Sequence, residues 1–260
     1  MSDVDIDAIA GQLLAAYRSG TTIPPLTRTY PGLTVDEAYA IQQRQADTRV
    51  GAGARIAGYK IGLTSVAIQQ QLGVDQPDYG HLLSDTVYGA DRPIGSGAFL
   101  QPRAEPEVAL ILGRDLRGPG LSPADVLSAT AYALPAIEII DSRITGWQIT
   151  LADTIADNAS SGGLVLGATA TPVAGLNLAL LGCVVRRNGR IEQTGAGAAV
   201  MGSPLNAATW LANTLTARGA RLSAGHVILT GSMTAAVPVS PGDAVSVAID
   251  RLGTVTAIFD

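Results

Sequence analysis

The chain has 260 residues, of which 47% are hydrophobic and only 15% charged, so it can bury a sizeable core and global disorder is not expected. Its net charge of −5 and pI near 5.0 argue against a nucleic-acid partner, which would require a basic surface. One cysteine, Cys183, and two histidines, His81 and His226, are too few for the common kinds of protein zinc site or for an internal disulfide.

The first 55 residues are predicted to form a helical part that precedes the strands. The acidic start, MSDVDIDAIA, lacks the pattern of a signal peptide, and no apolar run approaches the roughly 18 residues of a membrane span. We therefore expect a cytoplasmic protein without a membrane partner, which the absence of a disulfide also fits. Apolar spacing predicts a helix over residues 6–18, and a capping box that begins at Thr34 predicts a second helix to about Arg49.

From residue 55 onward, β-branched residues, turn residues and helix caps predict short strands with a few helices between them. The stretch GYKIG should be a strand that carries Lys60, and QPDYG should be a turn that carries Asp78. The other expected elements are a helix over 66–73, a strand after Glu107, a helix from Pro123 to about Tyr132, a buried strand over 135–140, a partly helical stretch over 143–158, strands from Leu164 onward and a helix over 204–217. This order predicts an α+β fold in a single domain over residues 1–260.

Two glutamates lie close together in the segment QPRAEPE, residues 101–107. Glu105 and Glu107 are two apart, so on a strand both leave from the same face, where repulsion and an apolar environment disfavour their charge. A solvated strand edge is the ordinary interpretation, but Glu138 stands alone within the apolar PAIEII and needs a partner. A divalent cation would remove both penalties. Three carboxylates without nitrogen or sulfur ligands indicate Mg²⁺ or Mn²⁺.

Other polar residues allow two interpretations each. Lys60 has apolar and glycine neighbours, so it either extends to solvent at a strand end, or binds a substrate carboxylate or transfers protons with a lowered pKa. Asp78 could orient Lys60 or a water molecule, although aspartate is ordinary in turns. Asp153 and Asp157 are spaced as on a solvated helix face, and Ser160 lies in a small-residue stretch typical of a plain turn, with anion binding as the alternative.

Seven segments resemble, in order and over nearly the whole chain, the hydratase/decarboxylase branch of the fumarylacetoacetate hydrolase superfamily: GYKIGLTS, QPDYG, QPRAEPEVAL, PAIEIIDSRI, DTIADNASSG, GSPLNAATWLANTL and LTGSMTAAVPVSPGD. The resemblance implies a fumarylacetoacetase-like α+β fold, with a mixed sheet rolled on itself, an N-terminal helical part and assembly into homo-oligomers, as pentamers or decamers. It places the metal ligands on Glu105, Glu107 and Glu138, the active-site lysine on Lys60, the catalytic aspartate on Asp78 and the substrate-binding serine on Ser160.

The same resemblance implies a metal-dependent hydratase that adds water to a 2-hydroxy-2,4-dienoate, giving a 4-hydroxy-2-oxo acid in aromatic meta-cleavage catabolism. Lys60 would bind the substrate carboxylate and transfer a proton, with Asp78 assisting. A 4-oxalocrotonate-type decarboxylase is the first alternative, and a non-catalytic protein that binds a keto acid and a metal is the second. A C–C hydrolase would require His81 or His226 beside Glu138. The small-molecule acid is the expected partner, and association with another enzyme of the pathway is left open.

Overall fold

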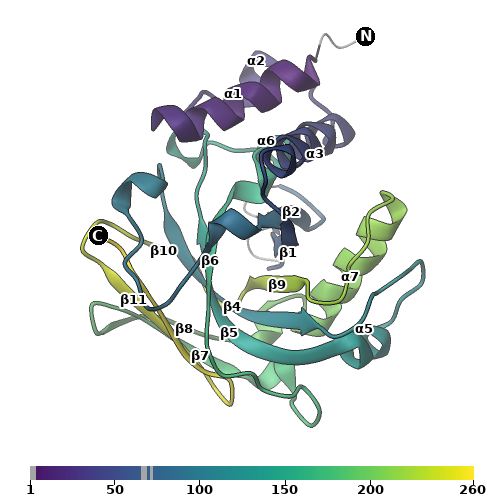
Figure 1. Cartoon of the computed structure of the whole chain (residues 1–260), viewed down its shortest axis with the longest axis vertical. Coiled ribbons are helices and arrows are strands. Elements are labelled where there is room, and N and C mark those ends of the chain that lie inside the picture. Colours follow the sequence, from purple (N-terminus) through teal and green to yellow (C-terminus); the bar gives the residue numbers. More distant parts are fainter. Residues whose placement is uncertain (1–3, 66–68, 71–72) are drawn as a thin grey trace.

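The computed structural model describes residues 4–65, 69, 70 and 73–260, so the short helix expected over 66–73 lies largely outside the described residues. Figure 1 shows a group of helices on one side of a strand-rich body. The N-terminal helices precede the strands in the chain, and this arrangement confirms the expected α+β fold with an N-terminal helical part. In the part of the chain that the structure describes, no helix combines the length and the apolar character that crossing a membrane requires.

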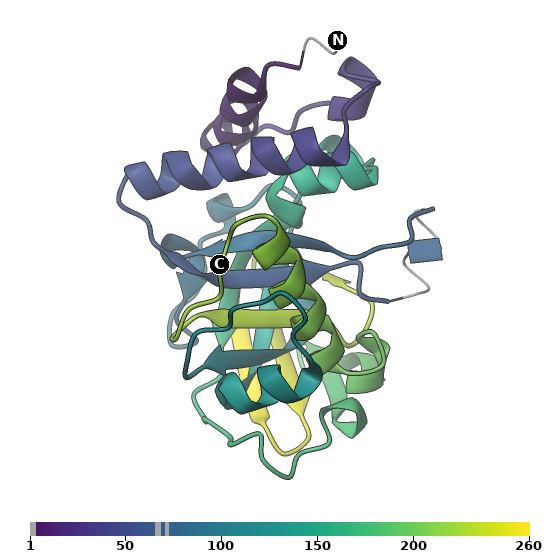
Figure 2. The ribbon, with the colours of Figure 1, turned by 90° about the vertical axis from the view of Figure 1, so that its right-hand side faces the viewer.

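The helical layer contains α1 (Ile6–Ser19), α2 (Leu26–Thr29), α3 (Val35–Gly51) and, from the middle of the chain, α6 (Leu151–Ala156). Helix α3 begins at the expected capping box, in which the Thr34 hydroxyl accepts a hydrogen bond from the backbone N–H of Glu37. It packs against both α1 and α6. Two further helices, α5 (Pro123–Ala129) and α7 (Pro204–Ala217), pack together on the side of the sheet that faces the viewer in Figure 2.

The body consists of two sheets. The larger has the strand order β2-β1-β9-β4-β5-β6-β3, with β10 paired to β4, and it is mixed because the β1–β9 and β3–β6 pairs are parallel. Its strands are β1 (Ile56–Gly62), β2 (Asp78–Leu83), β3 (Val87–Tyr88), β4 (Arg103–Leu112), β5 (Thr130–Ile140), β6 (Ser161–Leu166), β9 (Val227–Ser232) and β10 (Val237–Pro238). The smaller, antiparallel sheet has the order β12-β11-β7-β8 and contains β7 (Gly182–Arg187), β8 (Arg190–Ala196), β11 (Ala244–Ile249) and β12 (Gly253–Ile258).

The two faces of the larger sheet have different roles, and strand β4 shows the division. Its residues Val108 and Leu110 join the main core, which unites the helices with both sheets. The alternate residues Ala109 and Ile111 point to the other face, where they belong to a second buried cluster made of Leu82, Ala109, Ile111, Leu134, Ala136, Leu164, Val227 and Leu229. Glu105 and Glu107 continue this second face toward the start of β4. Polar residues therefore share a buried sheet face with an apolar cluster.

Two sequence expectations were wrong in this region, and a third was confirmed. Asp78 does not lie in a turn but begins β2, where it pairs with Gly62 of β1. Helix α5 ends at Ala129, because the next residues join the long strand β5. The stretch 143–158 is partly helical, as expected, and its main helix is α6, which ends just before Asp157.

Candidate active site

Three carboxylates converge on the second face of the larger sheet, the face that also carries Ala109 and Ile111. Glu105 and Glu138 are direct partners in the antiparallel β4–β5 register, and Glu107 follows two residues along β4. One carboxylate oxygen from each residue lies within 4.8 Å of the others. Glu107 and Glu138 are completely buried, and Glu105 is partly exposed. The geometry brings together Glu105 and Glu107, which strand alternation had paired, with Glu138, the lone acid of an apolar segment.

The oxygens of this cluster lack the donors that buried carboxylates need. Glu107 Oε1 and both carboxylate oxygens of Glu138 are buried without a hydrogen-bond partner in the described part of the chain. Glu107 Oε2 accepts a hydrogen bond of 2.7 Å from the N–H of Gly231, whose φ of 112° lies at an irregularity in the β4–β9 pairing. Buried carboxylate oxygens without hydrogen bonds are costly, and an all-oxygen, negatively charged donor set suits a hard divalent cation. The residues therefore fit a hard divalent cation.

Burial and mutual repulsion also disfavour ionisation of these acids in the metal-free protein. Burial, followed by the charge of Glu138, raises the pKa of Glu105 to about 7. The pKa of Glu107 is raised well above its usual value by burial and by the charges of Glu138 and Glu105. Burial raises the pKa of Glu138 as well, although Lys60 opposes this shift. Near neutral pH, a metal ion would have to displace protons from this cluster.

Lys60 occupies the same face from strand β1 and is only 3% exposed. Its Nζ donates a hydrogen bond of 3.0 Å to the carbonyl oxygen of Ala159 and lies 3.3 Å from Glu138 Oε1, an ion pair without hydrogen-bond alignment. Burial alone would lower the pKa of Lys60, but the charges of Glu138 and the other nearby acids outweigh burial and raise it. The expectations of an extended surface lysine and of a lowered pKa were both wrong. Lys60 is a buried ammonium.

Asp78 lies beside Lys60 because β1 and β2 place Gly62 opposite Asp78. A Cβ atom at Gly62 would collide with Asp78 Oδ1 and lie 3.4 Å from Lys60 Nζ, so the absence of a side chain there lets both polar groups approach. Asp78 Oδ2 accepts a hydrogen bond of 3.3 Å from the hydroxyl of Thr154, and Oδ1 is buried without a partner among the described residues. Burial raises the pKa of Asp78, with Lys60 opposing the shift.

The carbonyl group that Lys60 contacts belongs to an unusual turn. Asn158, Ala159 and Ser160 have φ angles of 54°, 51° and 52°, a conformation that costs L-residues roughly 1–2 kcal/mol each. The turn is held by the Asn158 side chain, which accepts a hydrogen bond from the His81 N–H and donates one to the His81 carbonyl group, at 2.8 and 3.0 Å. It places the Ser160 hydroxyl 3.4 Å from that of Thr154. Ser160 is thus part of a strained turn at the site rather than of a plain one.

The two acids expected on a solvated helix face are both completely buried. Asp153 caps α6 and accepts hydrogen bonds from the backbone and hydroxyl of Thr27, which tie α2 to α6. Asp157 forms an ion pair with the buried Arg143, whose guanidinium also stacks 4.4 Å from the centre of the Tyr17 ring. Asp157 immediately precedes the strained turn, so this buried pair anchors one end of it.

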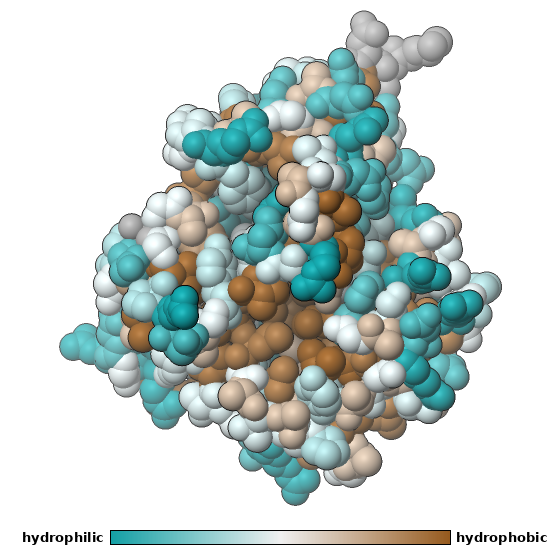
Figure 3. Space-filling view, in the orientation of Figure 1, coloured by the Kyte–Doolittle hydropathy of each residue, from teal (hydrophilic) through white to brown (hydrophobic). Residues whose placement is uncertain are grey.

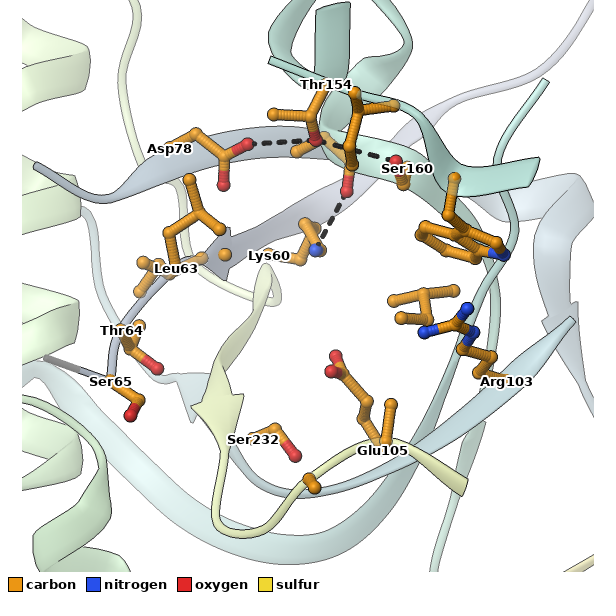
Figure 4. A pocket seen from close by; sticks show the side chains of 18 of the residues that line it. Lys60, Leu63, Thr64, Ser65, Asp78, Arg103, Glu105, Thr154, Ser160 and Ser232 are labelled. Carbon is orange, nitrogen blue, oxygen red and sulfur yellow. Dashed lines mark hydrogen bonds between the residues drawn. The ribbon is translucent and has the colours of Figure 1, made fainter. Parts of the chain in front are cut away.

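These groups surround a cavity of about 360 Å³. Figure 4 shows Lys60, Asp78, Thr154 and Ser160 on one side of it and Glu105 on the other. Glu107 and Glu138 lie beyond the cavity lining, deeper in the sheet. The cavity therefore presents an ammonium group, carboxylates and hydroxyl groups to one small molecule.

Comparison with known proteins now identifies the family. Residues 57–259 match the family described as Fumarylacetoacetate (FAA) hydrolase C-terminal. The chain belongs to this family. It is 46% identical to 2-keto-4-pentenoate hydratase of Paraburkholderia xenovorans (strain LB400) over 96% of this chain and 93% of that protein. It is 43% identical to 2-hydroxyhexa-2,4-dienoate hydratase of Comamonas testosteroni over 100% of this chain and 99% of that protein.

A solved structure is also similar to this member of the FAA hydrolase family. The 4-oxalocrotonate decarboxylase from Pseudomonas putida G7, complexed with magnesium and adipate, superposes with a TM-score of 0.95. The two chains are 36% identical, and the match covers 98% of this chain and 97% of the decarboxylase. Fold and family expectations from the sequence are confirmed, and both branches of the expected chemistry are represented among the relatives.

The histidine arrangement expected of a C–C hydrolase of the wider superfamily does not occur at Glu138. Residue His81 pairs with Tyr59, whose side chain leaves β1 on the face opposite to that of Lys60. The rings of His81 and His226 lie 5.1 and 6.1 Å from the ring of Tyr59. Both histidines therefore lie behind the sheet rather than in the cavity.

Several residues of this FAA hydrolase site were not predicted from the sequence. Arg103 and Trp147 line the cavity beside Glu105, and Thr154 bonds to Asp78. Arg103 precedes Glu105 by two residues, so the alternation that linked Glu105 to Glu107 also predicts its direction. Lys60, which was predicted, could also have been singled out because it is the only lysine in the 260 residues.

Proposed function

We propose that this FAA hydrolase family member is a metal-dependent hydratase that converts a 2-hydroxy-2,4-dienoate into a 4-hydroxy-2-oxo acid. The observation that carries the proposal is the cluster of Glu105, Glu107 and Glu138 beside a cavity that also contains Lys60 and Asp78. Full-length relatives that are 43–46% identical are 2-keto-4-pentenoate and 2-hydroxyhexa-2,4-dienoate hydratases, which supports this substrate class.

The three glutamates would hold the metal, which we propose to be Mg²⁺ or Mn²⁺. When bound, the ion supplies a Lewis acid that polarises the C2 oxygen of the substrate and stabilises negative charge there. Divalent metal dependence is supported by the similar decarboxylase, whose structures were obtained with magnesium and with calcium. The buried oxygens of Glu107 and Glu138 that have no hydrogen-bond partner among the described residues support the same assignment from this chain alone.

The remaining groups are suited to proton transfer and orientation. As the dienol becomes a ketone, the O2–H bond breaks and a C5–H bond forms: the Lys60 ammonium would donate the proton to C5, and the resulting amine would regain a proton from O2. Water then adds across C3 and C4, with the hydroxyl going to C4 and the proton to C3. The pKa of Asp78 is raised by burial, and its Oδ1 has no hydrogen-bond partner among the described residues; Asp78 would accept a proton from that water and return it to C3. The hydroxyl of Ser160 would help to orient the substrate, with Thr154 fixing Asp78.

A 4-oxalocrotonate-type decarboxylase is the second candidate, favoured by the TM-score of 0.95 to such an enzyme. It would use the same polarised C2 oxygen, with CO₂ leaving in place of water arriving. Product identification by NMR with 2-hydroxypenta-2,4-dienoate and with 4-oxalocrotonate, each with Mg²⁺ or Mn²⁺, separates the two. We expect 4-hydroxy-2-oxopentanoate from the first compound. CO₂ release from the second without hydration of the first would favour the decarboxylase, and binding without turnover of either would favour the non-catalytic alternative.

We also propose that residues 1–260 act as one catalytic domain and assemble as a homo-oligomer, as a pentamer or decamer. One hydrophobic core joins the helices to both sheets, which supports a single unit. Apolar side chains gather in the middle of the face shown in Figure 3, and such a patch supports burial against another subunit. Light scattering that gave a monomer at micromolar concentration would contradict the assembly.

A further inference from the structure

Arg103 is a cation of the cavity that the proposed chemistry has not used. It lies on the same face of β4 as Glu105 and lines the cavity. Figure 4 shows its guanidinium group pointing into the cavity, on the side opposite to Asp78 and Thr64. Across the described residues, the contact made by this group is with the Trp147 ring, 4.5 Å from the ring centre, and it has neither an ion pair nor a side-chain hydrogen bond. Its donors are free for a ligand.

Trp147, the ring on which Arg103 stacks, is held in place by hydrogen bonds around Gln101. Its Nε1 donates a hydrogen bond of 3.2 Å to the carbonyl oxygen of Gln101. The Gln101 side chain accepts a hydrogen bond of 2.8 Å from the N–H of Gly146, and its amide donates to the carbonyl groups of Ser142 and Ile144. Trp147 itself has a φ of 58°, an unfavourable conformation that these bonds help to maintain. The aromatic platform is therefore fixed before any ligand arrives.

Lys60 is poorly suited to bind a substrate carboxylate in the same cavity. Its ammonium group already contacts the Ala159 carbonyl group and Glu138, and the residue is only 3% exposed. A guanidinium group offers a planar pair of donors that matches both oxygens of a carboxylate, and stacking on an aromatic ring leaves those donors available. Arg103 meets these requirements, and Lys60 does not.

We propose that Arg103, supported by Trp147, binds a carboxylate group of the substrate, whereas Lys60 is confined to proton transfer. The inference rests on the proposed function in taking the ligand to be an oxo or hydroxydienoic acid. Its carboxylate is either the C1 group, next to the C2 oxygen, or a second carboxylate at the far end of a longer acid. Arg103 can reach a carboxylate at either end of the acid, because a second cavity of about 490 Å³ is lined by Arg103 and Trp147 together with Phe99 and Pro238.

The test is calorimetric binding of unreactive acids to the full chain with Mg²⁺, comparing wild type with Arg103→Gln. The probes are 2-oxopentanoate, which has one carboxylate, and 2-oxohexanedioate, which has two. Loss of a charged hydrogen-bond pair should raise Kd by about 10- to 100-fold. An equal rise for both acids assigns Arg103 to the C1 carboxylate, and a rise for the diacid alone assigns it to the far carboxylate. Unchanged Kd for both acids would overturn the proposal.

Three further variants separate binding from folding and from turnover. Arg92→Gln removes a cation whose side chain is 85% exposed, and it should leave both Kd values unchanged. Arg103→Lys keeps the charge but loses the planar fork, so Kd should rise by about 3- to 10-fold even if Arg103→Gln proves unstable. Lys60→Met should retain Kd and lose turnover; the reverse pattern would return carboxylate binding to Lys60. Because the probes need no turnover, wild type that binds them but hydrates no dienoate would refute the proposed function and leave the role of Arg103 intact.

Discussion

Replacement of Lys60 by methionine separates a catalytic lysine from a structural one. Methionine keeps much of the apolar stem and removes the charge, so the surrounding strand should accommodate it. The substitution removes two contacts, the 3.0 Å hydrogen bond to the Ala159 carbonyl group and the 3.3 Å ion pair with Glu138. If Lys60 transfers the proton to the substrate, turnover should fall by roughly 10²- to 10⁴-fold, the usual contribution of one acid–base group.

The expected loss of stability is smaller than the two contacts suggest. Removal of one partner from a buried ion pair usually costs about 3–5 kcal/mol, because the other charge stays unpaired. Here Lys60 opposes the effect of burial on the pKa of Glu138, so its removal raises that pKa further and the carboxyl group takes up a proton instead. What remains is the Ala159 carbonyl group without its donor, a cost of about 1–3 kcal/mol.

Metal affinity provides the internal control for this variant. Because the Lys60 ammonium lies 3.3 Å from Glu138 and repels a cation bound there, Mn²⁺ affinity at pH 8 should be retained or increased. Steady-state kinetics, urea unfolding without metal and Mn²⁺ calorimetry measure the three quantities, with the exposed Arg92→Met as the matched loss of a cation. A variant that keeps wild-type turnover but unfolds easily would refute the catalytic role and make Lys60 a structural residue.

Three other predictions concern the buried charges. The pKa of Glu105 is raised to about 7, so metal-free protein should lose stability as pH rises from about 4.5 to 7, and metal affinity should fall as pH drops below 7. Metal affinity that is constant from pH 5.5 to 8, without proton release in calorimetry, would contradict this. Glu138→Gln should weaken Mn²⁺ binding by about 100-fold or more in calorimetry, because it removes one negative group from the cluster, and the exposed Glu192→Gln should leave Mn²⁺ affinity unchanged. Arg143→Met should destabilise the protein by about 3–5 kcal/mol in urea unfolding, because it leaves Asp157 buried and unpaired; a loss below about 1 kcal/mol would show that Asp157 readily becomes neutral.

The part of the site that follows from local geometry could be predicted from the sequence. Side chains alternate along a strand, so Glu105 and Glu107 had to share a face, and a lone acid such as Glu138 in an apolar strand had to find a partner. The same rule would have found Arg103. The sequence also indicated the order of helices and strands, because caps and apolar periodicity act over a few residues.

What could not be predicted depends on contacts between distant segments. Asp78 looked like a turn residue because Pro and Gly flank it, but pairing with β1 extends the chain there and turns its carboxylate toward Lys60. Asp157 looked solvated because its spacing from Asp153 is that of a surface helix, but Arg143, fourteen residues earlier, provides a buried partner. Local propensity is a weak guide where tertiary contacts satisfy the backbone and the charges.

The only lysine of the protein is buried, so the surface of the folded chain presents no lysine amine. The other basic residues are arginines, and the amine of Lys60 is buried among the acids of the cavity. Reagents that acylate amines should therefore leave the side chains of the folded protein untouched, apart from reaction at the α-amino group. Slow acylation of Lys60 would require the cavity to open or the chain to unfold. Mass spectrometry of a peptide that contains residue 60 would follow this reaction, and its rate would measure how often the interior of the cavity meets solvent. Protection of Lys60 by metal and substrate would be measured in the same peptide.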